Sequence, residues 1–201
     1  VINSLLKERD LKKSIKILQN QLMDLLDGKY PLDMLIISKS LRGYYKNPNQ
    51  IAHKVLADRI GKREPGNKPM VNDRVPYVYI ETKTTKGQAV LQGDKIESPD
   101  YIIRNKLRPD YTFYITNQIM KPVGQIYALI VEKLDGFKYT DTYYSEQMEY
   151  YVKKLGYKKA KDKITDLRMT DANKIIFGEI LRIAKNRKNK TREITDFFKR
   201  H

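Results

Sequence analysis

Apolar side chains recur at helical spacing near the start of the chain and again further along. In "DLKKSIKILQNQLMDLLDGKYP", residues 10–31, leucines and isoleucines repeat every three or four positions, which predicts an amphipathic helix. Asp10 is placed to cap the start of this helix, and Gly28 to end it. "NPNQIAHKVLADRIGKREPG", residues 47–66, has the same periodicity and predicts a second helix that Pro65 ends.

Short runs rich in β-branched and aromatic residues predict a small antiparallel sheet. The first is "DMLIISKSL", residues 33–41, and the second is the alternating "DRVPYVYIETK", residues 73–83. "GQAVLQGDKIE", residues 87–97, predicts a further short strand with a turn at Gly93. Pro76 has no N–H to donate, so we expect its strand to lie at an edge of the sheet, or Pro76 to stand at the strand start.

Helices are expected to dominate after Pro99. Three segments each open near a proline with an acidic or polar residue alongside, as helix starts do. They are residues 98–106, 108–120 and 121–136. Beyond Gly136 the chain becomes Tyr- and Lys-rich, and a further helix is expected over residues 170–186 before a basic tether at 187–193.

The pattern as a whole predicts an α+β protein that is mainly helical. A helical body with a small antiparallel sheet extends to about residue 135. A helical C-terminal extension is expected over residues 136–185, and a flexible basic tail over residues 186–201.

Net charge limits the classes of molecule that this chain is expected to bind, and cysteine content indicates its compartment. The chain has 40 Lys and Arg against 24 Asp and Glu, a formal net charge of +16, which favours a polyanionic partner, nucleic acid above all. The basic residues are spread over many segments rather than along one helix, so an anionic membrane fits less well. No apolar run approaches the roughly 18 residues of a membrane span. There is no cysteine, which excludes disulfides and thiolate metal sites and favours an intracellular compartment.

The chain opens on Val1 rather than methionine, within an amphipathic pattern and without the features of a signal peptide. We therefore expect it to be the C-terminal piece of a longer protein.

No self-sufficient active site is predicted, and neither catalytic nor metal-binding residues are assigned. The sequence has no phosphate-binding loop, no G-x-S-x-G and no dinucleotide-binding fingerprint. Asp94 and Glu97 are acidic neighbours, but nothing suggests that they converge on a metal ion with Asp100 or Asp110. We interpret these carboxylates as turn and cap residues.

A binding surface is easier to locate, because basic side chains are interleaved with hydroxyls in the segments around the predicted strands and second helix. Phosphate-backbone contacts draw on this mixture of side chains. The candidate DNA-binding residues are Lys39, Ser40, Arg42, His53, Lys54, Arg59, Lys62, Arg63, Arg74 and Lys83. The alternative for each is a place on a solvated basic face. The helically spaced aromatics Tyr111, Phe113 and Tyr114 are interpreted as core residues.

Five motifs follow one another along the first two thirds of the chain. They are "LIISKSL" (35–41), "QIAH" with "LADRI" (50–60), "KREPG" (62–66), "DRVPYV" (73–78) and "NKLRPDYTFYITNQIMKP" (105–122). Together, and in this order, they resemble the start of the thumb region of family B DNA polymerases, the replicative class that includes the eukaryotic delta enzyme.

The resemblance implies a thumb over residues 31–135 that closes on the primer–template duplex, preceded by the last palm-to-thumb helix at 1–30. The family's catalytic aspartates, and the Mg²⁺ that they bind, lie in the palm, upstream of this segment. The remainder of the polymerase chain is thus a partner, and the expected location is a site of DNA replication, either the nucleus or a cytoplasmic viral factory. Delta-type enzymes continue into a cysteine-rich domain that is missing here, which favours an archaeal or large-DNA-virus source.

The end of the chain carries a further motif. Ile194, Phe197 and Phe198 would share one face of a helical turn. "TREITDFF", residues 191–198, resembles the sliding-clamp-binding box of polymerase C-termini, with Thr191 where the box has glutamine. The alternative is a terminal helix that folds back onto the body.

Two other classes of protein remain open. One is a stand-alone basic nucleic-acid-binding module without enzymatic activity. The other is an RNA-binding structural protein, for which Tyr77 and Tyr79 are the only candidates for stacking on bases, and these share a face that we expect to pack inward.

Overall fold

The computed structural model describes residues 10–82 and 91–188 of the chain. These residues form two compact units. The sheet unit runs from Gly28 to Tyr114, and the helical unit combines the chain up to Asp27 with the chain from Ile115 onward. Among the described residues, no helix is both long and apolar enough to cross a membrane.

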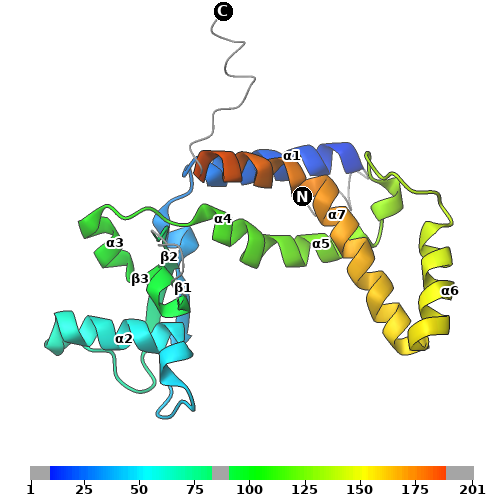
Figure 1. Ribbon diagram of the computed structural model, residues 1–201. Coiled ribbons are helices and arrows are strands. Elements are labelled where there is room, and N and C mark those ends of the chain that lie inside the picture. Colours follow the sequence, from blue (N-terminus) through cyan, green and yellow to red (C-terminus); the bar gives the residue numbers. More distant parts are fainter. Residues whose placement is uncertain (1–9, 83–90, 189–201) are drawn as a thin grey trace, which may run out of the picture. The chain divides into compact units, whose positions relative to one another are not determined.

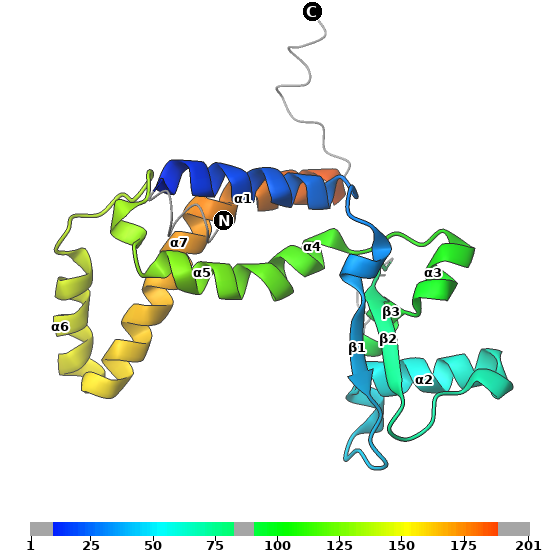
Figure 2. The ribbon, with the colours of Figure 1, turned by 180° about the vertical axis from the view of Figure 1, so that it is seen from behind.

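The sheet unit contains three antiparallel strands, as predicted. They are β1 (Ile37–Ser40), β2 (Arg74–Tyr79) and β3 (Ile96–Glu97), in the order β1-β2-β3. Figure 2 shows β1 and β2 side by side, although residues 41–73 separate them in the sequence. β3 is shorter than the strand expected over 87–97, because residues Gln92–Lys95 form a 3₁₀ turn instead.

The expectation that Pro76 would confine its strand to an edge is wrong for the strand order, since β2 lies in the centre. β3 pairs only with Val78 and Tyr79, whereas Pro76 stands opposite Ser38 of β1. The ladder on the β3 side therefore begins after the proline, and the missing N–H breaks no bond to β3.

Helix α2 (Ala52–Arg63) covers one face of the sheet. Its Leu56 and Ala57 are buried with Val75 and Tyr77 of β2, in a core that also includes Leu41 and Ile96. These are apolar positions of the predicted second helix and strands, so the pattern placed the core of this unit correctly.

The aromatic residues pack inside the sheet unit, as predicted. Helix α3 (Pro99–Asn105) is followed by the single turn α4 (Tyr111–Tyr114). Phe113 stacks on Tyr79 with ring centroids 3.6 Å apart. The Tyr114 hydroxyl donates to the Leu35 carbonyl at 2.7 Å and accepts the Tyr79 N–H at 3.0 Å, and burial raises the pKa of Tyr114 to about 12.

The helical unit is built from α1 (Leu11–Leu26), α5 (Met120–Ala128), α6 (Tyr143–Leu155) and α7 (Tyr157–Lys188). Asp10 caps α1 as expected, accepting the Lys13 N–H at 2.9 Å. Ser14 of α1 and Tyr127 of α5 share a buried hydrogen bond of 2.7 Å between their hydroxyls. Figure 1 shows α7 bending along its length, with its first part beside α6 and its last part beside α1.

Two helix boundaries differ from the prediction. Ile115–Ile119 is π-helical and runs into α5 without a break, so no new helix opens near Pro122. The helix expected over 170–186 forms, but it is the second half of α7, which begins at Tyr157. Helix α6 lies within the helical extension expected over residues 136–185, although the sequence analysis gave it no bounds of its own.

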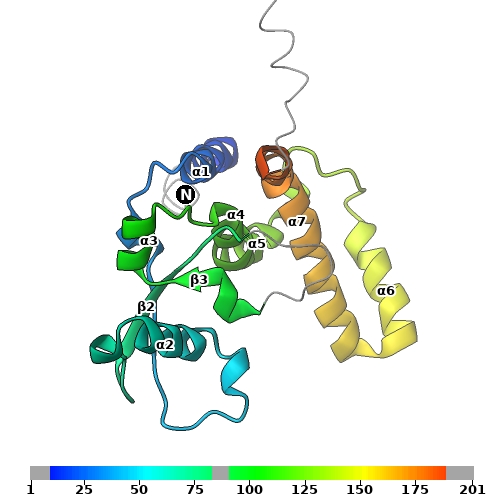
Figure 3. The ribbon, with the colours of Figure 1, turned by 60° about the vertical axis from the view of Figure 1, so that its left-hand side comes forward.

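Helices α6 and α7 form an antiparallel pair joined by a tight turn at Gly156 (Figure 3). The Tyr144 hydroxyl donates to Asp171 at 3.0 Å, and the Arg168 guanidinium lies over the Tyr144 ring, 4.6 Å from its centroid. Arg168 is also paired with Glu132, which ties the segment after α5 to α7.

Candidate nucleic-acid interface

The predicted DNA-binding cations divide into two groups by their partners. Among residues 10–82 and 91–188, Lys39, Arg42, Lys62 and Arg74 are exposed and form no ion pair with a carboxylate. In contrast, Lys54, Arg59 and Arg63 each have a carboxylate within the sheet unit. Lys83 lies outside the described residues.

Arg74 is held in place by the neighbouring strand. Its Nε donates to Oγ of Ser38 and its Nη2 to the Ser38 carbonyl, both at 3.1 Å. Ser38 stands opposite Pro76, and Ser40 opposite Arg74 itself, so these residues share one face of the β1–β2 pair. That face carries two hydroxyls and an exposed guanidinium, which is a suitable arrangement for a phosphate group.

A second part of the predicted DNA-binding surface lies around His53 of α2. The Tyr45 hydroxyl accepts the Arg42 backbone N–H at 2.8 Å and lies 3.1 Å from Nε2 of His53. Since the hydroxyl accepts from Arg42, its own hydrogen is available to Nε2, which is consistent with a neutral imidazole. The tyrosine thus connects the loop after β1 to α2.

The pKa of His53 lies below its ordinary value of 6.5. Burial is the largest cause, and the positive charges of Lys39 and Arg42 lower the pKa further, partly offset by a hydrogen bond with the Ser40 backbone. The positive charges of Lys39 in β1 and Arg42 in the loop after it therefore both act on the imidazole of His53, at the start of α2. An approaching phosphate would reverse the effect on the pKa.

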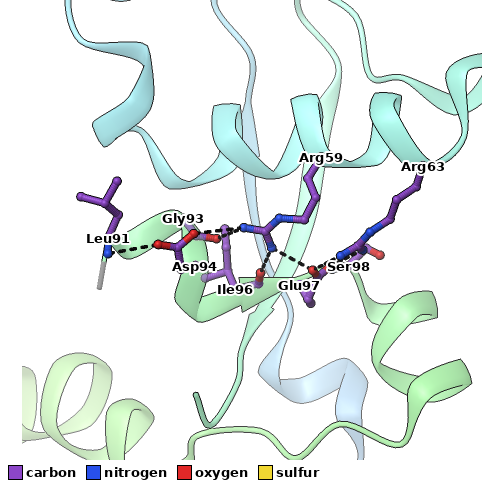
Figure 4. Close-up of polar contacts among 8 residues, drawn as sticks. All are labelled: Arg59, Arg63, Leu91, Gly93, Asp94, Ile96, Glu97 and Ser98. Carbon is purple, nitrogen blue, oxygen red and sulfur yellow. Dashed lines mark hydrogen bonds and ion pairs between the residues drawn. The ribbon is translucent and has the colours of Figure 1, made fainter. Parts of the chain in front are cut away.

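Arg59 and Arg63 do not belong to this exposed group. Both extend from α2 to Glu97, as Figure 4 shows, with Nη–Oε1 distances of 2.8 Å and 2.9 Å. Arg59 also donates to the carbonyls of Gly93 at 2.6 Å and Ile96 at 3.0 Å. These internal acceptors account for the guanidinium of Arg59 without any external anion.

Glu97 is the centre of this network and is only 4% exposed. Its Oε2 accepts from Arg63 at 3.2 Å and from the Ser98 N–H at 3.3 Å. The Arg63 guanidinium also lies over the Tyr101 ring, 3.7 Å from its centroid, and its hydrogen bond to Glu97 is the main reason why its pKa is raised. The network joins α2, β3 and α3.

The interpretation of the acidic neighbours as turn and cap residues is right for one of them. Asp94 accepts the Leu91 N–H at 3.3 Å and stabilises a 3₁₀ turn. Glu97, however, is a buried ion-pair partner. The described residues contain no cluster of three or more side chains that could hold a metal ion.

Close packing also fixes the position of α2 against this turn. A Cβ on Gly93 would lie 2.7 Å from the Val55 side chain, so only glycine allows the helix to approach. Lys54, on the same helix, pairs with Asp58 one turn later at 2.6 Å.

Three residues of this site were not found by sequence reasoning: Ser38 and Tyr45 as positioning groups, and Glu97 as an ion-pair partner. The hydroxyls carried a weak signal, because both were seen interleaved with the basic residues. Glu97 carried none, since it meets Arg59 and Arg63 across gaps of 38 and 34 residues.

The predicted clamp-binding residues Thr191, Ile194, Phe197 and Phe198 lie outside the described residues. Tyr77 and Tyr79 lie inside them and are turned inward: Tyr77 is buried, and Tyr79 is stacked on Phe113. The two tyrosines are therefore not available to stack on RNA bases, which removes the main support for an RNA-binding structural protein.

Exposed basic side chains interleaved with hydroxyls are a general feature of surfaces that contact nucleic acid. The sequence model of DNA polymerase family B matches residues 1–130. The chain belongs to this family.

Individual relatives agree. The chain is 42% identical over 199 residues to a DNA polymerase of Pyramimonas orientalis virus, covering 98% of this chain and 16% of the relative. It is 46% identical over 145 residues to a DNA polymerase of Acanthamoeba polyphaga mimivirus, covering 71% and 8%. The DNA polymerase delta catalytic subunit of Candida albicans is 34% identical over 131 residues, covering 65% and 12%.

The chain therefore spans less than a fifth of the length of these relatives. The family match ends at residue 130, before α6 and α7 begin. The relative from Pyramimonas orientalis virus aligns over 98% of the chain and so includes this C-terminal region as well.

Proposed function

We propose that this chain is the thumb and C-terminal part of a DNA-directed DNA polymerase, and that its sheet unit grips the primer–template duplex behind the active site. The observation that carries the proposal is the group of Lys39, Arg42, Lys62 and Arg74. These side chains are exposed and have no carboxylate partner among the described residues, and Arg74 is fixed beside the hydroxyl of Ser38.

Phosphate contacts of this kind hold a duplex without reading its sequence. Lysine and arginine replace condensed counterions on the phosphates, so binding should weaken steeply with salt, by about 0.9 in the log–log slope for each phosphate neutralised. Sequence-independent binding is what a polymerase needs, because the duplex moves past the same side chains after every nucleotide added.

The cations have different roles because they have different partners. Arg59 and Arg63 hold α2 against Glu97 and so fix the helix next to the exposed basic residues. Lys39 and Arg42 carry positive charge near His53, which adds a titratable group to the sheet unit. The chain's own residues thus position DNA, and none of them is assigned a role in the chemical step.

Family membership supports a parent enzyme that synthesises DNA from a template. The bound metal of that reaction, Mg²⁺, belongs to palm aspartates outside this segment, as the resemblance implies. A parent of this kind acts where DNA is replicated, in the nucleus or in a viral factory. The tail motif at Ile194, Phe197 and Phe198, with Thr191, adds a proposed contact with a sliding clamp.

The test is a salt titration of duplex binding by the chain. We expect the combined change Lys39→Gln, Arg42→Gln and Arg74→Gln to weaken binding and to make the log–log slope shallower by roughly 0.9 for each phosphate that is no longer neutralised. The matched control is Arg104→Gln, Lys106→Gln and Arg108→Gln. It removes the same charge from exposed positions at and after the end of α3.

An equal effect of both triple variants would mean that only net charge matters, and would overturn the assignment of this face. The alternative function, a stand-alone nucleic-acid-binding module, predicts the same binding result. It is distinguished by adding the segment to the remainder of the polymerase chain: only the thumb assignment predicts that the triple variant then shortens the tracts copied.

A further inference from the structure

The turn between α6 and α7, in the helical unit, carries a dense group of lysines. Residues 153–163, here called the basic turn, read "KKLGYKKAKDK". The basic turn contains six lysines and one aspartate, a formal charge of +5, and all six lysines are exposed. Its lysines are Lys153, Lys154, Lys158, Lys159, Lys161 and Lys163.

These lysines have no carboxylate partners within residues 10–82 and 91–188. Among the side-chain contacts of the described residues, Lys154 donates to the Tyr150 hydroxyl at 3.4 Å and lies 5.6 Å from the centroid of that ring. Arginines further along α7 differ, since Arg168, Arg182 and Arg187 each pair with an acidic residue. The positive charge of the basic turn is therefore uncompensated.

Repulsion between the lysines of the basic turn lowers the stability of the fold. Lys159 and Lys163 are four residues apart on α7, and like charges at this spacing destabilise a helix. A surface that serves only solubility needs only a few charges of mixed sign. A bound polyanion would neutralise the lysines together and so remove the repulsion between them.

Exposed apolar groups lie within the same surface. Tyr157 is 68% exposed, Tyr150 is 53% exposed and Leu155 is 42% exposed. A face whose purpose is solubility has no reason to present two aromatic rings among its lysines. Aromatic rings beside positive charge are the features of surfaces on which unpaired bases stack.

The basic turn is held firmly by the two helices. Gly156 has a φ of +79°, which favours glycine, and its N–H donates to the Val152 carbonyl at 3.0 Å. Its carbonyl accepts the N–H of Ala160 at 3.0 Å, and the Ala160 side chain is buried. The lysines and Tyr157 thus project from a fixed turn, so less conformational freedom is lost on binding.

We propose that the basic turn is a binding site for single-stranded DNA, with lysines on phosphates and Tyr157 stacked on a base. Single-stranded DNA is favoured over a duplex because base faces in a duplex are already stacked on one another. It is favoured over an acidic peptide because every nucleotide brings both a phosphate and an aromatic base, whereas aspartate and glutamate bring charge without a ring for the exposed tyrosine. This site lies in the helical unit, beyond the residues matched by the family, and goes beyond the duplex grip of the sheet unit.

The experiment measures binding of a fluorescent oligothymidylate to the chain by anisotropy at several salt concentrations. We expect Lys153→Gln, Lys154→Gln, Lys158→Gln and Lys159→Gln together to weaken binding and to reduce the log–log slope by about 0.7 for each phosphate that the variant no longer neutralises. The control changes the exposed Lys16, Lys121, Lys133 and Lys185 to glutamine, the same loss of charge elsewhere in the helical unit. It should have a much smaller effect.

A second variant tests stacking separately. Tyr157→Ala should weaken oligothymidylate binding roughly tenfold without changing the salt slope, because stacking releases no counterions. Tyr157→Phe should bind almost as tightly as the unchanged chain. Duplex binding should be unaffected by Tyr157→Ala but reduced by the triple variant of the sheet unit, so the two proposals fail independently.

Three results would overturn the proposal: equal losses in the two lysine variants, tighter binding of duplex than of oligothymidylate with no effect of Tyr157→Ala, or equally effective competition by polyglutamate. The first would assign binding to net charge, the second to duplex phosphates alone, and the third to polyanions in general. Melting temperatures of all variants check that the exposed substitutions leave the fold intact.

Discussion

The Arg74 guanidinium donates to Oγ and to the backbone carbonyl of Ser38 across the β1–β2 pair, both at 3.1 Å. The serine thus fixes an exposed cation that has no carboxylate partner in the described residues. A long side chain that is already held in place loses less freedom when a phosphate binds. This relationship holds Arg74 in one position, as the proposed contact with a phosphate requires.

The first prediction concerns that preorganisation. Ser38→Ala removes one of the two acceptors of Arg74 but no charge, so Arg74 must be ordered when DNA binds, and duplex affinity should fall by up to about 0.5–1.5 kcal/mol, the cost of immobilising one long side chain. The salt slope should stay unchanged. Anisotropy titrations with a duplex would show this, with Ser98→Ala, away from the basic face, as the control. A shallower slope in Ser38→Ala would show that the serine affects the number of phosphates neutralised instead.

The second prediction concerns the network around Glu97. Glu97→Ala leaves the two guanidinium groups of Arg59 and Arg63 without their main acceptor, so it should destabilise the sheet unit by about 3 kcal/mol. Urea unfolding followed by tyrosine fluorescence measures the loss.

Its control is Glu64→Ala, which breaks two exposed contacts of Glu64, the pair with Arg104 at 3.4 Å and the hydrogen bond from Asn67 at 2.7 Å. That change should cost less than about 1 kcal/mol. If both substitutions cost the same, the Glu97 network does not hold α2 against β3 and α3.

The third prediction is a pH dependence set by His53. Its pKa in the folded protein lies below 6.5, so its neutral form contributes stability that is present above pH 6.5 and is lost as the pH falls through the lower folded value. DNA has the opposite effect, since a nearby phosphate raises the pKa. Duplex affinity should therefore increase as the pH is lowered below 6.5.

His53→Gln should abolish both pH effects below 6.5, because glutamine keeps a hydrogen-bonding group but does not titrate there. Thermal unfolding and duplex anisotropy over the same pH range provide the two measurements. Duplex affinity that rises equally in His53→Gln would assign the proton uptake to another group and remove His53 from the interface.

The fourth prediction concerns the tail. Phe197→Ala with Phe198→Ala should abolish stimulation of DNA synthesis by a sliding clamp, while clamp-free synthesis and the melting temperature stay unchanged. Thr191→Gln should tighten clamp binding, because an amide supplies hydrogen bonds that threonine lacks. A melting temperature several degrees lower in the double alanine variant would instead identify the phenylalanines as core residues of a helix that folds back.

The main elements of the fold could be predicted because each has a local signal. Helix α1 has its cap and leucine period, and β2 alternates Val75 and Tyr77 toward the core. The errors arose where tertiary context overrides that signal. Pro76 tolerates a central strand because β3 pairs only beyond it, and a π-helical segment carries the chain past the expected break near Pro122.

The candidate site could be predicted only in part, for a similar reason. The sequence showed that basic residues and hydroxyls are interleaved, but it did not show which of them have hydrogen-bond or ion-pair partners. Whether a cation is available to DNA depends on long-range contacts, such as that of Arg59 with Glu97, 38 residues away. No periodicity or motif encodes such a contact, so the sequence analysis could not tell Arg59 from Arg74. Of the two, only Arg59 has a carboxylate partner among the described residues.

The most direct test of the central claim compares the chemical step with DNA retention in the full-length parent polymerase. The variant Lys39→Gln, Arg42→Gln and Arg74→Gln should shorten the tract copied per binding event severalfold, whereas single-turnover incorporation of one nucleotide stays within about twofold, because these residues hold the product duplex and do not contact reacting groups. The opposite result, a collapse of single-turnover incorporation with unchanged tract length, would contradict the account.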